Sequence, residues 1–130
     1  MKKIFISLLI SFYSIIVHAT DWKEIAFNEK SKFYIDTKTV EKLPNSIFSF
    51  WLLNDFHKPV KLQNSPLSVS STKSKVNINC KSKESSISFT VAYTDKMGSG
   101  EVITSFKNNS EWVPIVPESS NDRIREFLCG

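Results

Sequence analysis

Glycine and histidine are scarce in this chain, and each scarcity excludes a class of site. Its 130 residues include only 3 glycines and 2 histidines. Loops that hold nucleotide phosphates or dinucleotide cofactors need several glycines at fixed spacing, and no such pattern occurs. The chain also lacks a Cys-x-x-Cys pair and any cysteine and histidine spacing typical of a metal site. We therefore expect no cofactor and no bound metal ion.

Charged residues are absent from a long run near the start of the chain. Lys2 and Lys3 precede an uncharged apolar segment from Ile4 to Val17. This order is typical of a secretory signal peptide. The segment is about 14 residues long, whereas a membrane-spanning helix needs roughly 20. The length therefore favours a cleaved leader over a membrane anchor.

Small residues at the end of this segment indicate where the leader is cut. Val17 and Ala19 stand where signal peptidase accepts small side chains, so we predict cleavage between Ala19 and Thr20. No cysteine lies near this cut to accept a lipid anchor. We expect residues 1–19 to be a signal peptide and residues 20–130 to form one exported domain without a transmembrane segment. Its expected location is the periplasm or the medium, with the cell surface as a further option.

Little net charge remains in the predicted mature chain. The whole chain has 17 basic and 13 acidic residues, a formal net charge of +4. Residues 1–19 contain Lys2 and Lys3 but no acidic residue, so their removal lowers the formal charge by two, to about +2. We do not expect an exported protein of this charge to bind nucleic acid. The charge indicates solubility and a weak attraction to anionic surfaces.

Cysteine is limited to Cys80 and Cys129. An even number of cysteines in an exported chain is typical of a disulfide. A bond between these two residues would close a loop of roughly 50 residues, which stabilises a fold by about 4 kcal/mol in the chain-entropy model. We therefore predict a Cys80–Cys129 disulfide.

Apolar and polar residues alternate along much of the chain, which predicts strands separated by turns. The expected strands comprise residues 21–27, 32–36, 46–55, 75–83, 85–93, 101–106 and 112–116. Residues 56–74 are polar and contain two prolines, so we expect a long connection there. The alternation is most regular in residues 85–93. It predicts four side chains on the core side of the sheet: Ile87, Phe89, Val91 and Tyr93.

Strand parity places the side chains of residues 75–83 on two faces. Val76 and Ile78 share the inward face with Cys80. Four lysines are expected on the opposite face: Lys73, Lys75, Lys81 and Lys83. We interpret them as a candidate binding surface for an acidic protein, a sulfated polysaccharide or anionic lipid headgroups. The alternative is a solvated strand face whose lysines prevent aggregation.

A helix is predicted only after Pro117. Ser119 can cap it, and Asp122 three residues later completes an approximate capping box. Three apolar side chains recur on one face at helical spacing: Ile124, Phe127 and Leu128. A helix of roughly ten residues is marginal alone. We therefore expect the disulfide to hold its apolar face against the sheet.

Candidates for catalysis are few. His57 follows Asp55 by two residues, a pair that serves acid–base chemistry only where a nucleophile converges on it. We interpret His57 as an exposed loop residue. Asp36 precedes a threonine and favours a turn in which the carboxylate accepts hydrogen bonds from nearby backbone. We predict no catalytic residue and no enzyme activity.

The three tryptophans are candidates for contacts with a partner. Trp51 lies in the most apolar predicted strand and is expected in the core. Charged residues flank Trp22 and Trp112, which we place in the core or at its rim, with partner contact as the alternative.

Several segments match the pattern of one known family. They are Trp22 in the first strand, FYIDTKTVEK, FSFWLLND, the strand that ends at Cys80, the glycine-containing turn, and EWVPIVPESSNDRIREFLC. Together they resemble the surface-adhesin protein E family of Gram-negative bacterial envelopes, over nearly all of residues 20–130. The resemblance implies an α+β fold: a single antiparallel sheet of about six strands, with a C-terminal helix across its concave face. It also implies a disulfide that matches Cys80 and Cys129.

The resemblance also implies a function, namely a non-catalytic adhesin anchored by lipid in the outer membrane. Such adhesins bind host matrix and serum proteins such as vitronectin, laminin and plasminogen. This chain lacks the lipidated cysteine, and Glu118 stands where the family usually has glycine. A soluble periplasmic accessory or inhibitor protein of the envelope is the alternative function. An acidic polysaccharide as partner and a homodimer also stay open.

Overall fold

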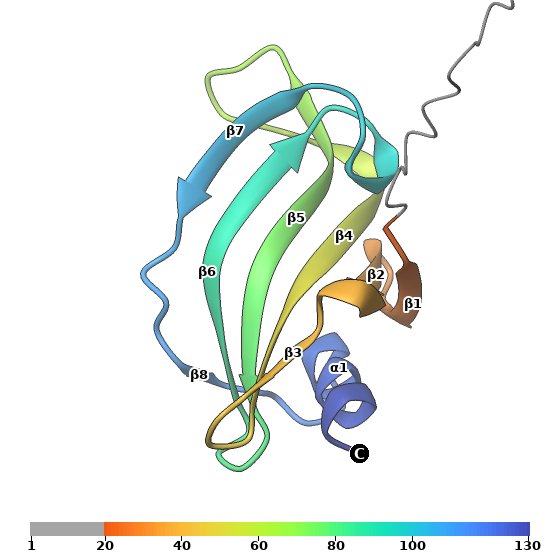
Figure 1. Ribbon diagram of the computed structural model, residues 1–130. Helices are drawn as coiled ribbons and strands as arrows, with labels where there is room; N and C mark the ends of the chain where they lie inside the picture. Colours follow the sequence, from red (N-terminus) through yellow and green to blue (C-terminus); the bar gives the residue numbers. More distant parts are fainter. Residues whose placement is uncertain (1–19) are drawn as a thin grey trace, which may run out of the picture.

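One antiparallel sheet with a helix on one face makes up residues 20–130, which are the residues that the computed structural model describes (Figure 1). The predicted signal peptide and its cleavage site lie outside this range, apart from Thr20. The α+β class predicted from the sequence is confirmed, with eight strands in place of about six.

The strands are β1 (Trp22–Phe27), β2 (Ser31–Asp36), β3 (Glu41–Leu43), β4 (Ile47–Lys61), β5 (Ser68–Asn79), β6 (Glu84–Tyr93), β7 (Val102–Lys107) and β8 (Val113–Pro114). Two 3-10 turns, η1 (Thr37–Thr39) and η2 (Lys96–Gly98), follow β2 and β6, and helix α1 spans Ser120–Cys129. Six strands lie in the order β1-β2-β4-β5-β6-β7. The short strands β3 and β8 pair with β4 and β6, and every pairing is antiparallel.

The long connection predicted for residues 56–74 is wrong. Strand β4 continues to Lys61 and β5 begins at Ser68, which leaves a short link between them. The pairing register of these strands shifts between Asp55 and Val60. Pro59 falls inside this interruption, where a residue without a backbone N–H removes no ladder hydrogen bond. Polar residues in this segment therefore extend two strands instead of ending them.

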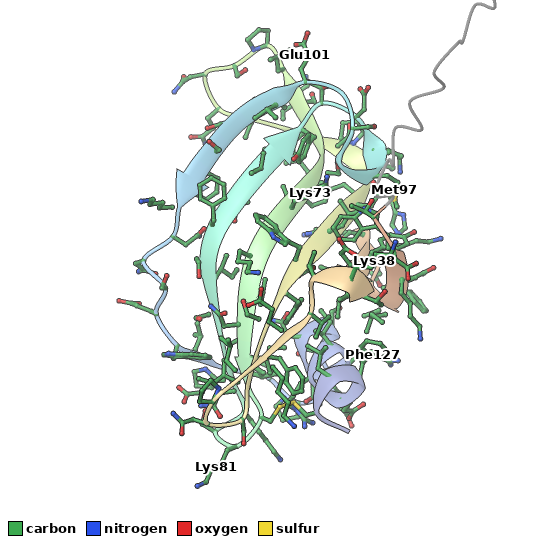
Figure 2. All side chains as sticks on the ribbon, viewed as in Figure 1. Lys38, Lys73, Lys81, Met97, Glu101 and Phe127 are labelled. Carbon is green, nitrogen blue, oxygen red and sulfur yellow. A yellow bond between two sulfur atoms is a disulfide. The ribbon has the colours of Figure 1, made fainter. Side chains whose placement is uncertain are left out.

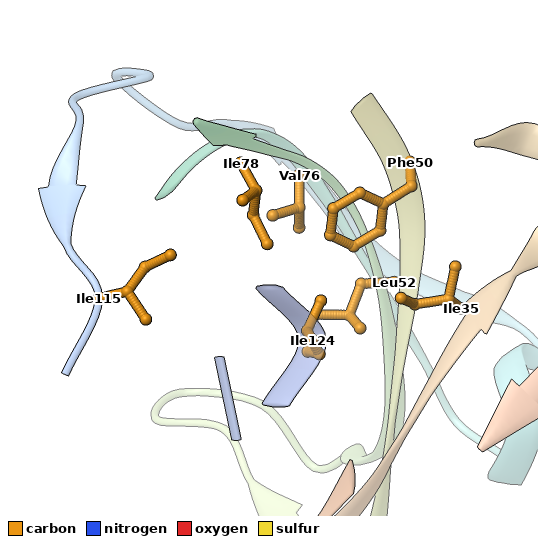
Figure 3. Packing of buried hydrophobic residues seen from close by; sticks show 7 residues of the cluster. All are labelled: Ile35, Phe50, Leu52, Val76, Ile78, Ile115 and Ile124. Carbon is orange, nitrogen blue, oxygen red and sulfur yellow. The ribbon is translucent and has the colours of Figure 1, made fainter. Parts of the chain in front are cut away.

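The core lies between α1 and one face of the sheet, which we call the helix face. Seven buried residues form it: Ile35, Phe50, Leu52, Val76, Ile78, Ile115 and Ile124 (Figure 3). Ile124 on α1 is only 1% exposed. Because burial of such a side chain contributes about 1.5–3 kcal/mol, packing stabilises a helix that would be marginal alone. Phe127 is 42% exposed instead, and the ammonium group of Lys23 lies 4.8 Å from its ring centroid.

Capping interactions define where α1 begins. The hydroxyl of Ser119 accepts a hydrogen bond from the Asp122 backbone N–H at 3.2 Å. The Asp122 carboxylate in turn accepts from the Glu118 N–H at 3.0 Å and from Arg125 Nε at 2.8 Å. The Glu118 N–H, followed by Arg125, holds the pKa of the Asp122 carboxyl below its usual value. The predicted cap at Ser119 is confirmed. The Asp122 carboxylate binds the N–H of Glu118, the residue before the capping serine.

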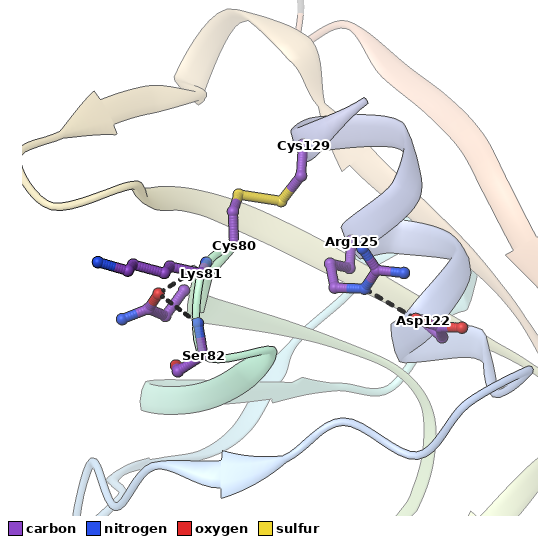
Figure 4. Close-up of a disulfide and its surroundings, with 7 residues drawn as sticks. Cys80, Lys81, Ser82, Asp122, Arg125 and Cys129 are labelled. Carbon is purple, nitrogen blue, oxygen red and sulfur yellow. Dashed lines mark hydrogen bonds and ion pairs between the residues drawn. A yellow bond between two sulfur atoms is a disulfide. The ribbon is translucent and has the colours of Figure 1, made fainter.

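The predicted disulfide is present and ends the helix. Cys80 directly follows β5 and Cys129 is the last residue of α1, with their Cα atoms 5.8 Å apart (Figure 4). The bond closes a loop with a sequence separation of 49 residues. It therefore ties the end of the helix to the turn between β5 and β6.

Candidate functional site

The sheet face opposite the helix carries alternating lysine and aromatic side chains. Directly paired residues of neighbouring strands project from the same face. The pairing register forms one row across β4, β5, β6 and β7: Trp51, Lys75, Phe89 and Lys107. A second row on these strands comprises Leu53, Lys73, Val91 and Ser105. We call this side of the sheet, around these two rows, the outer face.

A bulge in β6 determines which side chains reach the outer face. Lys75 pairs with Phe89, whereas the next residue, Val76, pairs with Ile87. Ser88 is therefore an extra residue in β6, and the alternation of side chains reverses at this point relative to β5. The predicted core-side position is consequently wrong for Phe89, Val91 and Tyr93, which share the face of Lys75.

Lysine ammonium groups lie over aromatic rings on this face. Lys73 Nζ lies 5.6 Å from the ring centroid of Trp22 and 5.2 Å from that of Tyr93. Lys75 Nζ lies 5.8 Å from the ring centroid of Trp51. At these distances each ring attracts the cation above it. Both lysines are half-buried, and their ammonium groups lie over the rings.

The turn after β6 closes over one end of the outer face, near Lys73 (Figure 2). The N–H of Met97 donates to Asp55 Oδ1 at 2.8 Å, and the N–H of Gly98 donates to Ser71 Oγ at 2.8 Å. A Cβ atom on Gly98 would come within 2.3 Å of Lys73 Cε. Gly98 also has a φ of 66°. Glycine suits this left-handed backbone conformation, and a side chain here would displace the end of the Lys73 side chain.

A shallow cleft opens between the tryptophan rings. It has a volume of about 330 Å³ and is lined by Thr20, Trp22, Asp36, Thr39, Trp51, Lys73, Val91 and Tyr93. The Asp36 carboxylate is engaged by the backbone N–H groups of Asp21 and Lys38, at 3.2 and 3.1 Å. The predicted turn role of Asp36 is confirmed. Since Asp36 is buried, the accessible charge in this cleft is that of Lys73.

The four predicted surface lysines form two groups and not one stripe. Lys73 and Lys75 lie on the outer face, as strand parity predicts. Strand β5 ends at Asn79, and Lys81 and Lys83 lie in the turn that follows. Figure 2 shows Lys81 at the far end of the sheet from Lys73. A binding role for either group stays a prediction.

Trp51 and Trp112 differ from expectation, whereas Trp22 agrees with a position at the rim of the core. Trp51 is half-buried on the outer face instead of lying in the core, because its strand alternates and Phe50 takes the core side. Trp22 is half-buried beside Lys73. Trp112 is 42% exposed. Sequence reasoning missed Phe89 and Lys107 as members of the outer face, since pairing across strands is not visible in one strand's pattern.

His57 and Asp55 have separate partners. His57 Nε2 lies 3.3 Å from the backbone oxygen of Asn28. Asp55 accepts from Met97, and its other carboxylate oxygen lies 3.9 Å from Lys96 Nζ. Within residues 20–130, no group of three or more His, Cys, Asp and Glu side chains is placed to hold a metal ion. In the same range, no helix has the length and apolar character to cross a membrane.

Comparisons with known proteins agree on the fold. Two solved structures of Haemophilus influenzae protein E resemble this chain. One has a TM-score of 0.66 and 17% sequence identity, and the match covers 85% of this chain and 88% of the chain of protein E. The other, crystal form II, has a TM-score of 0.65 and 14% identity and covers 85% and 95%. No curated protein matches the chain.

At such identities the solved structures show a shared fold alone. The model of the family named surface-adhesin protein E matches residues 22–130, which include every strand and the helix. The chain therefore belongs to the surface-adhesin protein E family.

Proposed function

We propose that this chain is an exported, non-catalytic adhesin that binds a macromolecular partner through its outer face. Membership of the surface-adhesin protein E family supports this function. The observation that carries it is the placement of Lys73 and Lys75 over three aromatic rings on a half-exposed sheet face.

The proposed partner is a host matrix or serum protein, such as vitronectin, laminin or plasminogen, as the family resemblance implies. Tryptophan and tyrosine are enriched among residues that dominate binding energy at protein interfaces. Lysines raise the rate of association with an acidic surface. Because the rings already position the ammonium groups of Lys73 and Lys75, less side-chain entropy is lost on binding.

A second candidate is a soluble periplasmic accessory or inhibitor protein of the envelope. The chain has 2 cysteines, and both are joined in the Cys80–Cys129 disulfide. Neither cysteine is therefore available for lipid attachment to the outer membrane. This favours the periplasmic location of the second candidate.

Protease treatment of intact cells distinguishes the two candidates. We expect an adhesin to be cleaved by protease added outside the cells, or to be recovered from the medium. Full protection in intact cells, digestion after the outer membrane is opened, and absence from the medium would exclude adhesion and support the accessory protein.

The outer face is tested with Lys75→Glu, and Lys81→Glu in the neighbouring turn serves as a control of equal charge change. We expect Lys75→Glu to weaken binding to immobilised vitronectin, laminin or plasminogen by about tenfold, and Lys81→Glu to leave it unchanged. Both variants should keep the melting temperature. Equal losses in the two variants, or no loss in either, would contradict a role for the outer face.

A further inference from the structure

The row across the outer face has a regular spacing. Trp51, Lys75, Phe89 and Lys107 lie one on each of four neighbouring strands, which Figure 1 shows side by side. Neighbouring strands are roughly 4.8 Å apart, so the backbones at Lys75 and Lys107 are separated by roughly 10 Å. Lys73 lies two residues from Lys75 along β5, at roughly 7 Å. Lys75 and Lys107 therefore flank the ring of Phe89, and Lys73 is a third cation on the same face.

Within β4 to β7, acidic side chains are absent from the two rows, and the second row continues through Tyr34 on β2 to the exposed Glu24 on β1. The eight residues of the two rows on β4 to β7 include three lysines and no aspartate or glutamate: Trp51, Lys75, Phe89, Lys107, Leu53, Lys73, Val91 and Ser105. The nearby Asp36 and Asp55 are both buried and accept hydrogen bonds from backbone N–H groups. The accessible charge of the two rows is therefore positive, which complements an anionic ligand.

We propose that the ligand of the outer face is a sulfated polysaccharide chain, bound across the strands. This proposal rests on the proposed adhesin function and assigns to the same face a polysaccharide in place of the protein partner. Sulfate groups along such a polymer repeat at short intervals and accept charge-assisted hydrogen bonds from lysines. The apolar faces of its sugar rings pack on aromatic rings, and Phe89 offers such a ring between Lys75 and Lys107.

The geometry favours this polymer over an acidic protein surface. Protein interfaces are centred on an apolar anchor that enters a desolvated pocket. Here the rings of Trp22, Trp51 and Tyr93 each have an ammonium group above them, so this face presents cations where an apolar anchor would need bare rings. The adjoining cleft of about 330 Å³ is shallow and lined by the same side chains. A linear polyanion needs no deeper pocket.

Binding of a heparin oligosaccharide by the folded domain of residues 20–130 tests the proposal, with the chemically desulfated oligosaccharide as the ligand control. We expect the sulfated chain alone to bind. Lys75→Gln and Lys107→Gln should each weaken binding about tenfold and lower the slope of log Kd against log salt concentration by about one. Phe89→Leu should weaken binding without a change in that slope, because it removes no charge.

The control variant is Lys81→Gln, which removes an equal charge from the turn after β5, outside the two rows. We expect it to bind like the unmodified chain. Equal weakening by Lys81→Gln would show a diffuse attraction to any polyanion and overturn the site. Absence of heparin binding with Lys75-dependent capture by immobilised vitronectin would overturn the polysaccharide and leave the adhesin function standing. Binding to neither ligand would overturn both proposals.

Discussion

Glu118 has a left-handed backbone conformation, with a φ of 64°, directly before the capping serine of α1. This conformation costs a residue with a side chain about 1–2 kcal/mol, whereas glycine adopts it freely. Glycine, however, loses more backbone conformational entropy on folding, which offsets part of this gain. We expect Glu118→Gly to raise the free energy of unfolding by about 0.5–1 kcal/mol, because its N–H can still donate to Asp122.

Thermal unfolding measures this change, and a rise of a few degrees is expected for a domain of this size. Ser119→Gly is the matched control, since it places a glycine at the next position, where φ is −79°. It should not stabilise the domain, because it removes the hydroxyl that caps the helix. A fall in melting temperature for Glu118→Gly would contradict backbone strain at this position.

Asp122 makes the start of the helix sensitive to acid. Its folded pKa is lowered by the Glu118 N–H and by Arg125. Stability from this carboxylate is therefore fully present above its unfolded pKa of about 3.9 and is lost as pH falls through the lower folded value. We expect Asp122→Asn to unfold more easily near neutral pH and to show a flatter decline below about pH 4.

Circular dichroism melts across this pH range check the prediction for Asp122. Asp95→Asn is the control, because the Asp95 side chain makes no capping hydrogen bond in η2. An unchanged acid response in Asp122→Asn would show that the carboxylate does not stabilise the helix.

At the scale of elements, the sequence predicted those features that depend on one short segment alone. Helix α1 and its cap follow from Ser119, Asp122 and the spacing of the apolar residues, and all of these are local. The β1–β2 and β6–β7 hairpins follow from turn residues between apolar runs, whereas the β3–β4 and β4–β5 hairpins were not predicted. The extent of β4 and β5 and the side from which Phe89 projects depend on register between strands. A bulge at Ser88 and an interruption near Pro59 set that register, and neither is visible in one strand alone.

The junction of α1 and β5 is the element-scale contact that the disulfide reinforces. We expect Cys129→Ser to lower the free energy of unfolding by about 4 kcal/mol, given the length of the closed loop, and to reduce helical ellipticity. Denaturant unfolding measures the loss. The double variant Cys80→Ser with Cys129→Ser should unfold at the same midpoint as the single variant. A midpoint equal to that of the unmodified chain would mean that the bond adds no stability.

At the scale of the whole molecule, both faces depend on one sheet. The same strands carry the core residues on the helix face and the tryptophans on the outer face. A single domain of this size unfolds cooperatively. We expect tryptophan fluorescence and far-ultraviolet ellipticity to report one transition with the same midpoint while the disulfide is intact. Two separated transitions would show that the outer face and the helix unfold independently.

The candidate site could be predicted only in part, because it depends on how neighbouring strands pair. Strand parity identified Lys73 and Lys75, since both lie within one regular strand. It did not identify Lys107, Phe89 or Tyr93 as their neighbours. Trp51 is paired directly with Lys75, and Tyr93 is paired with Ser71, two residues from Lys73. These contacts are properties of the assembled sheet.

The Cys80–Cys129 bond joins a residue made midway along the domain to one made after all eight strands. If the chain is exported from its N-terminus, Cys80 enters the oxidising compartment before Cys129 and stays a free thiol until α1 has followed. During that interval it can form a mixed disulfide with any accessible thiol or disulfide partner. Closure of the bond therefore requires that α1 has been translocated, and a reactive Cys80 thiol reports a domain whose helix is not yet in place.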